Sequence, residues 1–382
     1  MSAQTPLIYH MVQPETSPGA TNGFREFNTL SFVLSADGRK YVKNSLVLEF
    51  KVKAYSDAYT TRVTRANRIG IENKIGGHAF CDSWTCEVQS AGVIAQHNEY
   101  PRYVNMINSS SRNINDVADA KSQAEHIGAT VQNGRYDIQA VNSNNSNAND
   151  TTITYDNDFS IQPKIVFNQM SGDDYSFSKN GNIRISMNLA KNNNALFGAN
   201  GAAASYEIVD PVLRFQSVPD DGSQGMMMLN SYSVIKNSIN STMANISARV
   251  PVDKCSGVAI SYLEQAHEND PVRNSYKLEK IPLWKSIQYL FNNSTSEYVS
   301  YKQEDRDSSV IMGLQALQND LSGTQCNAQN LRANEGFIQG LPFEEFIDLR
   351  SQTFNVNVES DSQQLTNNPR LIYLYFMSLI QL

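Results

Sequence analysis

Apolar and polar residues alternate one by one along several segments, and this pattern constrains the fold more than any other feature. Residues 46–55 are the clearest case, with Leu48 and Phe50 on one side and Glu49 and Lys51 on the other. Because successive side chains of a strand point to opposite faces, the pattern predicts a strand with one buried and one solvated face. Such strands are typical of antiparallel sheets, so the sequence predicts an all-β fold.

Other segments either alternate in the same way or form short apolar runs between turn signals. The predicted strands are 24–34, 84–89, 161–167, 182–189, 206–218, 226–235, 244–250, 258–263, 354–358 and 371–382. Short helices are expected at 101–108, 282–291 and 309–321. The last predicted strand is almost wholly apolar, which indicates burial between neighbouring strands.

Residues 71–108 combine a predicted strand with a predicted helix. A Gly76-Gly77 break comes first, and the helix then begins at Pro101, a residue suited to the first helical turn. Its apolar residues, Tyr100, Tyr103, Val104 and Ile107, fall on one side, which predicts an amphipathic helix.

The two halves of the chain share an order of elements. Each is expected to have a helix led by proline (Pro101, Pro282), a long polar excursion and an alternating strand, and to close on a strand with an X-Pro step (Pro211, Pro369). No repeat of individual residues accompanies this order, so it indicates duplicated architecture. The predicted fold is therefore two tandem eight-stranded antiparallel jelly rolls with short helices in the connections. The predicted limits are an N-terminal arm at 1–21, a first jelly roll at 22–219 and a second at 220–382, with the boundary at Pro219-Asp220-Asp221-Gly222.

Charge and hydropathy restrict the possible functions. The formal net charge of −7 argues against nucleic-acid binding by the chain as a whole. Arg62, Arg65 and Arg68 could form a local basic strip, but we interpret them as a solvated or ion-paired loop. We expect neither an export signal nor a membrane span, so sequons such as Asn108-Ser109-Ser110 and Asn240-Ser241-Thr242 are expected to stay unmodified. Proteins that act outside cells without such a signal are typical of virions released by lysis.

Residues able to carry chemistry are present, but none has a diagnostic spacing. Cys81, Cys86, Cys255 and Cys326 match no zinc pattern and are interpreted as free, buried thiols. His78, His97 and His267 belong to no paired motif, although Glu99 lies near His97 and Glu268 follows His267, so we interpret these histidines as structural or surface residues.

Two acidic pairs and a methionine run are further candidates for a site. Asp173-Asp174 and Asp220-Asp221 could hold calcium at a subunit contact, but turn chemistry is the preferred interpretation. Met226-Met227-Met228 is interpreted as flexible core filling, and Trp84 and Trp284 as core anchors of the two domains. The sequence therefore predicts no catalytic residues, no metal site and no cofactor.

Residues 71–108 and 206–218 resemble the corresponding parts of jelly-roll capsid proteins of tailless icosahedral DNA viruses. In those proteins a turn containing Asn or Gly leads to a strand, followed by a short helix led by an aromatic residue and proline. The tandem arrangement looks like that of the double jelly-roll major capsid proteins. This resemblance implies a trimeric capsomer of pseudo-hexagonal outline, with its barrels upright on the shell and no catalytic residues.

The function expected from these observations is that of a structural major capsid protein, not an enzyme, that self-assembles into an icosahedral virion shell. Expected partners are further copies of the chain in trimeric and neighbouring capsomers, other virion proteins, nucleic acid or an inner membrane on the inner face, and a host receptor on the outer loops. One alternative is a single jelly-roll capsid or penton protein, parvovirus-like or virophage-like, with long loops. Another is a glycan-binding or glycan-cleaving β-sandwich protein, for which Glu345 with Asp348, or Asp173 with Asp174, are the nearest carboxylate pairs.

Overall fold

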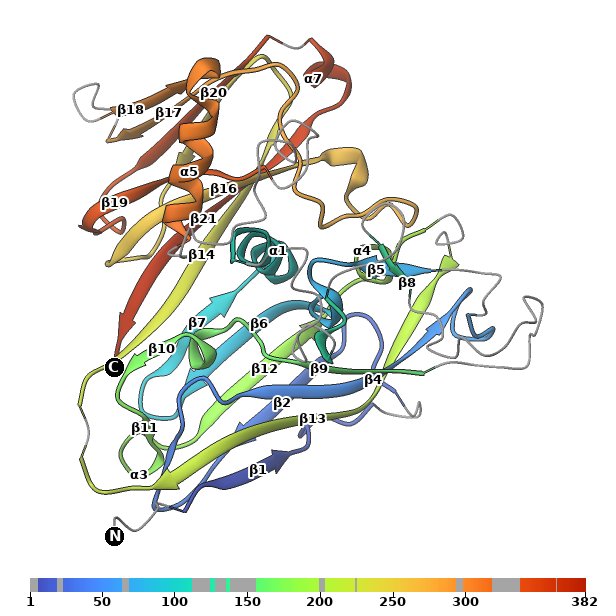
Figure 1. Cartoon of the computed structure of the whole chain (residues 1–382), viewed down its shortest axis with the longest axis vertical. Coiled ribbons are helices and arrows are strands. Elements are labelled where there is room, and N and C mark those ends of the chain that lie inside the picture. The colour runs from blue at the N-terminus through green and yellow to red at the C-terminus, as the bar shows by residue number, and fades with distance from the viewer. Residues whose placement is uncertain are drawn as a thin grey trace.

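The computed structural model shows two β structures stacked along the long axis of the molecule, joined near the middle by a helix (Figure 1). It describes residues 6–18, 23–63, 69–111, 124–127, 135–137, 156–198, 203–223, 225–292, 298–317, 337–361 and 363–382. Most of the long polar region predicted at 109–158, including the asparagine-rich run at 142–149, lies outside these residues.

The first β structure consists of two main sheets. Their strands are β1 (Ile8–Val12), β2 (Thr29–Leu34), β3 (Arg39–Tyr41), β4 (Val47–Tyr55), β6 (Cys81–Val88), β7 (Gly92–His97), β9 (Asp156–Ile161), β11 (Tyr175–Ser176), β12 (Ile183–Leu189) and β13 (Ser205–Pro219). One sheet has the order β11-β3-β13-β4-β9, with β1 also paired to β13, and the other has the order β2-β12-β6-β7. A small sheet of β5 (Gly70–Glu72) and β8 (Arg135–Asp137) lies beside them.

The second β structure also has two sheets. Its strands are β14 (Met227–Ile239), β15 (Met243–Ala248), β16 (Cys255–Glu264), β17 (Trp284–Phe291), β18 (Tyr298–Lys302), β19 (Gln339–Ile347), β20 (Phe354–Ser360) and β21 (Arg370–Gln381). The sheet orders are β14-β21-β16-β19 and β15-β20-β17-β18, and the short β10 (Met170–Gly172) extends the first of them next to β14.

Strand order is the same in the two β structures. The series β1-β13-β4-β9 corresponds to β14-β21-β16-β19, and β2-β12-β6-β7 corresponds to β15-β20-β17-β18. In each case the first strand pairs with the last, and the strands alternate between two facing sheets, which is the jelly-roll order. The described residues therefore contain two tandem jelly rolls, as the sequence predicts, and the single jelly-roll alternative is wrong.

Alternation explains why these strands form where they do. In β12 the residues at odd positions, Ile183, Ile185, Met187 and Leu189, are buried, while Arg184 is exposed and the polar residues between the others are partly covered. The buried side chains form two apolar clusters, one for each roll. Trp84 belongs to the first cluster and Trp284 to the second, which confirms that both tryptophans are core residues.

The helix predicted at residues 282–291 is wrong. Trp284–Phe291 forms β17, which pairs with β18 on one side and β20 on the other, and Leu283 before it has a positive φ of 47°. Ile287 and Tyr289 are buried on one face, so the local spacing of Leu283, Ile287 and Leu290 did not decide the outcome. Two neighbouring strands offered backbone partners, and tertiary pairing outweighs local periodicity in such short segments.

The duplicated order nevertheless holds with a different helix. In the first roll the hairpin β6–β7 leads into α1 (Tyr100–Ser111), and in the second the hairpin β17–β18 leads into α5 (Arg306–Ala316). The helix predicted at 309–321 matches α5 up to its end, while residues 318–336 lie outside the described part of the chain.

A second error concerns the strand predicted at 161–167. The strand there, β9, covers the preceding residues and ends at Ile161, while Val166–Asn168 forms the 3-10 helix η3. Asn168 caps the connection, since its side chain accepts from Leu46 N and donates to Leu46 O, and this replaces further strand pairing.

The remaining helices are short. They are η1 (Gly76–Phe80), α3 (Phe177–Asn180), α4 (Asn192–Ala195), η5 (Gln265–His267), η6 (Gln303–Asp305) and α7 (Gln364–Asn367). Among the helices of the described residues, none combines the length and apolar character needed to cross a lipid bilayer.

Candidate functional site

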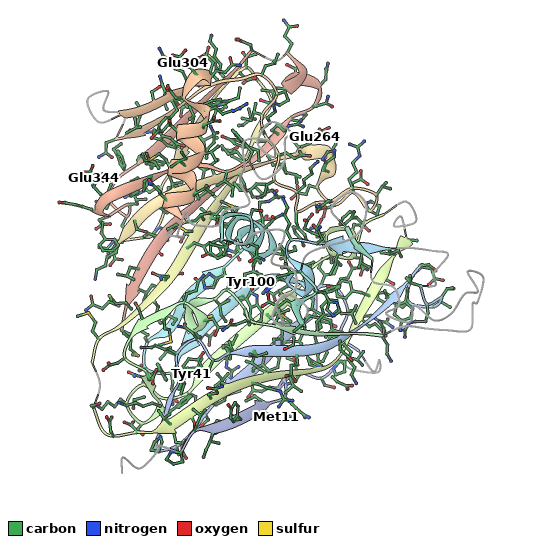
Figure 2. The ribbon with its side chains drawn as sticks, viewed as in Figure 1. Met11, Tyr41, Tyr100, Glu264, Glu304 and Glu344 are labelled. Atoms are coloured by element: carbon green, nitrogen blue, oxygen red, sulfur yellow. The ribbon has the colours of Figure 1, made fainter. Side chains whose placement is uncertain are left out.

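The junction between the two rolls is centred on α1. This helix lies between the lower and the upper roll in Figure 1, and Tyr100 is labelled on it in Figure 2. Residues 100–110 are all buried, so the predicted helix exists, but it is not half exposed. Tyr100 and Val104 pack into the first core, whereas Tyr103, Met106 and Ile107 pack into the second. A helix with apolar residues toward both cores ties the rolls into one unit.

Polar residues of α1 bind the second roll through its backbone. We call residues 265–283, which connect β16 to β17, the strap. The buried guanidinium of Arg102 donates to the carbonyl oxygens of Ser275 at 2.5 Å and Lys277 at 2.9 Å. Asn105 Nδ2 donates to Tyr276 O at 2.8 Å. These bonds satisfy polar groups that a buried helix could not otherwise accommodate.

Arg102 also contacts an aromatic ring of the second roll. Its Cζ lies 4.1 Å from the ring centroid of Tyr373 on β21. A cation over an aromatic face adds attraction that is strongest when water is excluded. One residue of α1 therefore contacts both the strap and β21.

Aromatic rings line the other side of the junction. The ring of Tyr103 lies 4.1 Å from that of Tyr232 and 6.0 Å from that of Tyr375, and His97 lies 4.8 Å from Tyr232. The hydroxyls of Tyr232 and Tyr375 donate to the carbonyl oxygens of Asn98 and Glu99, at 3.1 and 3.0 Å. The link between β7 and α1 is thus bound by tyrosines of β14 and β21.

His78 supports α1 from within the first roll. Its Nδ1 lies 2.8 Å from Tyr100 Oη, which also accepts a hydrogen bond from Lys164 N at 2.8 Å. Glu125 Oε1 lies 3.7 Å from His78 Nε2, and all of these side chains are buried. Burial raises the pKa of Tyr100 well above its ordinary value, so the hydroxyl stays protonated. This arrangement positions the helix.

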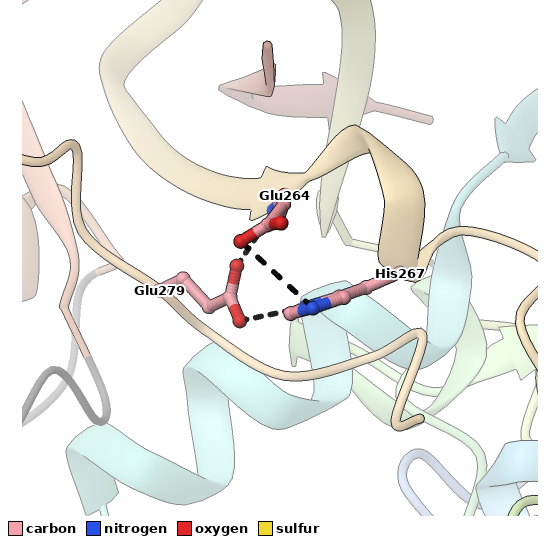
Figure 3. A group of neighbouring side chains, drawn as sticks. All are labelled: Glu264, His267 and Glu279. Atoms are coloured by element: carbon pink, nitrogen blue, oxygen red, sulfur yellow. Dashed lines mark hydrogen bonds and ion pairs between the residues drawn. The ribbon is translucent and has the colours of Figure 1, made fainter. Parts of the chain in front are cut away.

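A cluster with the residue types of a metal site lies at the strap. Figure 3 shows Glu264, His267 and Glu279 facing one another. His267 Nδ1 is 2.9 Å from Glu279 Oε1, Glu264 Oε2 is 3.8 Å from His267 Nε2, and Glu264 N donates to Glu279 Oε2 at 2.6 Å. Burial by itself would raise the pKa of Glu279. The hydrogen bonds that its carboxylate makes with His267 and with the Glu264 amide outweigh this effect, so the pKa of Glu279 is lowered.

The surroundings of this cluster fit an ion-pair network better than a metal ion. Arg370 Nη1 lies 2.7 Å from Glu264 Oε2, and Arg273 Nη1 contacts His267 Nε2. Carboxylate and imidazole ligands suit zinc, but a divalent cation here would lie close to two guanidinium groups and be repelled by both. The cluster therefore joins two parts of the strap, at His267 and Glu279, to each other, and Glu264 at the end of β16 to Arg370 of β21.

The predicted histidine neighbours do not pair. The carboxylates of Glu99 and Glu268 both form ion pairs with Lys236, and not with His97 or His267. Glu99 Oε1 lies 3.5 Å from Lys236 Nζ. His97 is buried and His267 binds Glu264 and Glu279, which the sequence did not indicate.

Asp220 and Asp221 take part in a turn, whereas Asp173 and Asp174 accept hydrogen bonds from residues distant in the sequence. Asp220 accepts from Gly222 N at 2.9 Å, Asp221 accepts from Lys40 Nζ at 2.5 Å, and both lie in the connection between the rolls. Asp173 accepts from Gly225 N at 2.5 Å, and Asp174 accepts from Lys43 N at 3.0 Å. The hydrogen bond from the Lys40 ammonium lowers the pKa of Asp221.

The carboxylates considered for glycan cleavage show no shared cleft in the described residues. Glu345 is exposed on β19, and Asp348 accepts from Arg350 at 2.8 Å.

Met227 is buried in the first core, whereas Met226 is 57% exposed.

Other candidates are described only in part. Cys81, Cys86 and Cys255 are free and buried, and burial raises the pKa of each thiol, while Cys326 lies outside the described residues. The Arg62 guanidinium lies 5.3 Å from the Tyr55 ring, but Arg65 and Arg68 are not among the described residues.

A groove of about 600 Å³ runs along one side of the junction. Its walls are β7, β14, the loop after β15 and the end of β21, with residues such as Val93, Ile94, Val234, Val252 and Ile380. The titratable residues of its lining are Arg249 and Asp253.

The residues that build the junction were missed in the sequence, since Arg102, Tyr232, Tyr375 and Glu279 carried no motif. One signal was available, namely the arginine and asparagine that stand among the apolar residues of the predicted helix. Such residues need backbone acceptors if the helix is buried.

Comparison with solved structures places this geometry in a known fold. No family model and no curated protein sequence matches the chain. The PBCV-1 virus capsid structure matches with a TM-score of 0.62 and 10% identity, covering 100% of this chain and 96% of that one. The chain has the double jelly-roll fold. The Faustovirus major capsid protein also has this double jelly roll, with a TM-score of 0.60 and 10% identity, covering 100% of this chain and 90% of that one.

A third similar structure comes from the Sputnik virophage, solved by cryo-EM. Its TM-score is 0.58 and its identity 9%, and the match covers 100% of this chain and 87% of that one. At identities this low, the likeness of the double jelly rolls concerns the fold.

Proposed function

We propose that this double jelly-roll chain is a structural major capsid protein that self-assembles into an icosahedral virion shell. The observation that carries the proposal is the pair of rolls with identical strand order, held as one unit by α1. Two matched rolls per chain let three chains form a ring of six similar rolls, which suits a pseudo-hexagonal capsomer. The likeness to a major capsid protein over the whole chain supports this assignment.

The division into an arm at 1–21 and rolls at 22–219 and 220–382 is part of the proposal. Residues 8–12 of this arm form β1, which pairs with β13 as the first strand of the first roll, so this part of the arm belongs to the edge of that roll. Tyr9 and Met11 on β1 are 70% and 62% exposed, and apolar residues this exposed on an edge strand are suited to contact another subunit. We propose that the arm contacts neighbouring subunits through these residues.

Further partners follow from this role. The chain would reside in the virion, with other virion proteins beside it, nucleic acid or an inner membrane on the inner face, and a host receptor on the outer loops. We propose that it has no enzymatic activity, since His78 and the Glu264 cluster are engaged in structural bonds.

Native mass spectrometry and negative-stain imaging of the purified chain test the proposal. The expected result is a trimer of hexagonal outline that forms larger shells on concentration. A persistent monomer or a pentamer would contradict it, and hydrolysis of a glycan panel would favour the glycan-cleaving alternative.

A pair of double variants makes the test specific to β1. Y9E together with M11E should leave the melting temperature of the isolated chain nearly unchanged but reduce assembly. Y9F together with M11L keeps the apolar area and should assemble normally. Equal assembly of both double variants would exclude β1 from the contact.

A further inference from the structure

His97 is a buried histidine at the point where the two rolls meet. It is the last residue of β7, its exposed fraction is 0%, and its ring lies 4.8 Å from Tyr232 of the second roll. Within the described part of the chain, neither ring nitrogen has a hydrogen-bond partner. His97 therefore differs from His78 and His267, whose rings bind a tyrosine hydroxyl and a carboxylate.

A neutral imidazole can be accommodated in this position, but an imidazolium cannot. Protonation would place an unpaired charge among apolar and aromatic side chains, away from water. The attraction between a cation and the face of Tyr232 is smaller than the cost of burying that charge. Burial alone accordingly lowers the pKa of His97 to about 3.

The charged and titratable groups around His97 do not supply a counter-ion. The elements that pack around His97 each contribute titratable residues. These residues are Tyr100 and Tyr103 of α1, Tyr232 and Lys236 of β14, Tyr375 of β21, Asp82 of β6, and Glu99 between β7 and α1. The tyrosines stay neutral because burial raises their pKa values. Glu99 is engaged with Lys236 at 3.5 Å.

Asp82 acts in the opposite direction. Desolvation and the neighbouring Glu99 raise its pKa to about 6, so its protonation on acidification favours the closed form. Asp82 has more contact with water than His97, so its desolvation is partial and its opposing contribution is expected to be smaller than that of a fully buried ring.

We propose that His97 makes the junction between the rolls acid-labile, so that acidification opens the contact of β7 with β14 and lets the imidazole reach water. The sign follows from linkage. Below the ordinary histidine pKa of 6.5, the opened form binds a proton that the closed form does not bind, until the pH approaches 3. The closed junction therefore loses stability as the pH falls through this window and keeps it above pH 6.5.

Hydrogen exchange of the isolated chain tests the inference, independently of any role in a capsid. One proton taken up on opening increases the opening equilibrium constant about tenfold for each pH unit below 6.5. After correction for intrinsic rates, backbone amides in residues 92–111 should show an increase between pH 5.5 and 4.5 that is smaller than tenfold to the extent that Asp82 opposes it. Amides of β16, inside the second roll, should not.

Two variants isolate the contribution of the ring. H97F fills a similar volume with a ring that cannot be protonated, and it should abolish most of the pH-dependent increase in residues 92–111. H10F is the matched control, because His10 stacks on Phe215 at 4.5 Å on β1, far from α1, and it should behave like the unmodified chain. An increase of the same size in H97F would overturn the inference.

A measurement on the unmodified chain keeps the inference testable if H97F does not fold. Exchange of the histidine C2 hydrogen reports the pKa of each histidine by mass spectrometry. The pH dependence of the C2 exchange rate should show that the His97 ring stays neutral until the junction opens. Titration near 6.5 with residues 92–111 still protected would overturn the inference.

Discussion

Arg102 of α1 donates a 2.5 Å hydrogen bond to the carbonyl oxygen of Ser275 in the strap. The same guanidinium lies over the Tyr373 ring, so one buried side chain joins three parts of the junction. R102M keeps much of the apolar stem but leaves the buried carbonyl of Ser275 and the partly buried carbonyl of Lys277 without their donor. We expect a loss of about 3–5 kcal/mol in the free energy of unfolding, measured by urea titration.

R350M is the control for this prediction. Arg350 is 57% exposed and pairs with Asp348 on the surface, so its removal should change the free energy of unfolding by less than about 0.5 kcal/mol. Similar losses in R102M and R350M would show that Arg102 does not hold the junction.

Gly76 is expected to be irreplaceable at the start of η1. Its φ is 53°, and a Cβ there would overlap the carbonyl oxygen of Glu125 and lie 2.9 Å from the carbonyl carbon of His126. G76A should therefore cost at least about 3 kcal/mol, or prevent folding, as judged by thermal melting.

Gly92 offers a matched control for backbone strain. Its φ is also positive, at 75°, but a Cβ there would meet nothing within 4 Å. G92A should cost only the left-handed strain of about 1–2 kcal/mol. If the two variants melt at the same temperature, the close approach of Glu125 is unimportant.

Glu279 should contribute stability that depends on pH. Its pKa is lowered in the folded chain, so the contribution is present above the ordinary value of 4.5 and is lost as the pH falls below it. E279Q should lower the free energy of unfolding by about 2 kcal/mol at pH 7, because charge-assisted hydrogen bonds to His267 and Glu264 N are weakened.

The difference between E279Q and the unmodified chain should be smaller at pH 3.5 than at pH 7, because below 4.5 the unfolded chain takes up a proton at Glu279 that the folded chain binds less readily. E345Q, on the exposed side of β19, should have no measurable effect at either pH. A constant difference from pH 7 to pH 3.5 would contradict the ion-pair interpretation of the cluster.

Tyr100 should stabilise the chain through its hydroxyl group as well as its ring. Y100F removes the bonds to His78 Nδ1 and Lys164 N while keeping the aromatic packing. The expected loss is about 1–3 kcal/mol in urea unfolding. Y9F, which alters an exposed tyrosine, should be neutral, and equal effects of both variants would count against this role of the Tyr100 hydroxyl.

Segments with sustained alternation could be predicted because their burial is a local property. The strand predicted at 46–55 is β4, the one at 182–189 is β12, and the one at 206–218 is β13. In each case one face had to be covered whatever lay opposite, so the pattern alone was sufficient. The tandem order was also visible, because turn signals and X-Pro steps recur in both halves.

Segments whose state depends on a neighbour could not be predicted. Residues 284–291 have spacings compatible with a helix, and they become β17 only because β18 and β20 lie on both sides. The 161–167 segment fails for a related reason, since the side chain of Asn168 takes over the bonds that a strand would have made.

The sequence by itself determined that this chain forms two similar all-β units, since period-two alternation, turn residues and apolar clusters are local properties of the chain. Only the tertiary structure decided how the units are joined. The packing of α1 against the second roll, the bonds of Arg102 to the strap and the isolation of His97 beside Tyr232 depend on contacts between residues more than 130 positions apart. Such contacts leave no periodic signal in the sequence around either partner, because each involves a single polar or aromatic residue whose partner is distant in the sequence.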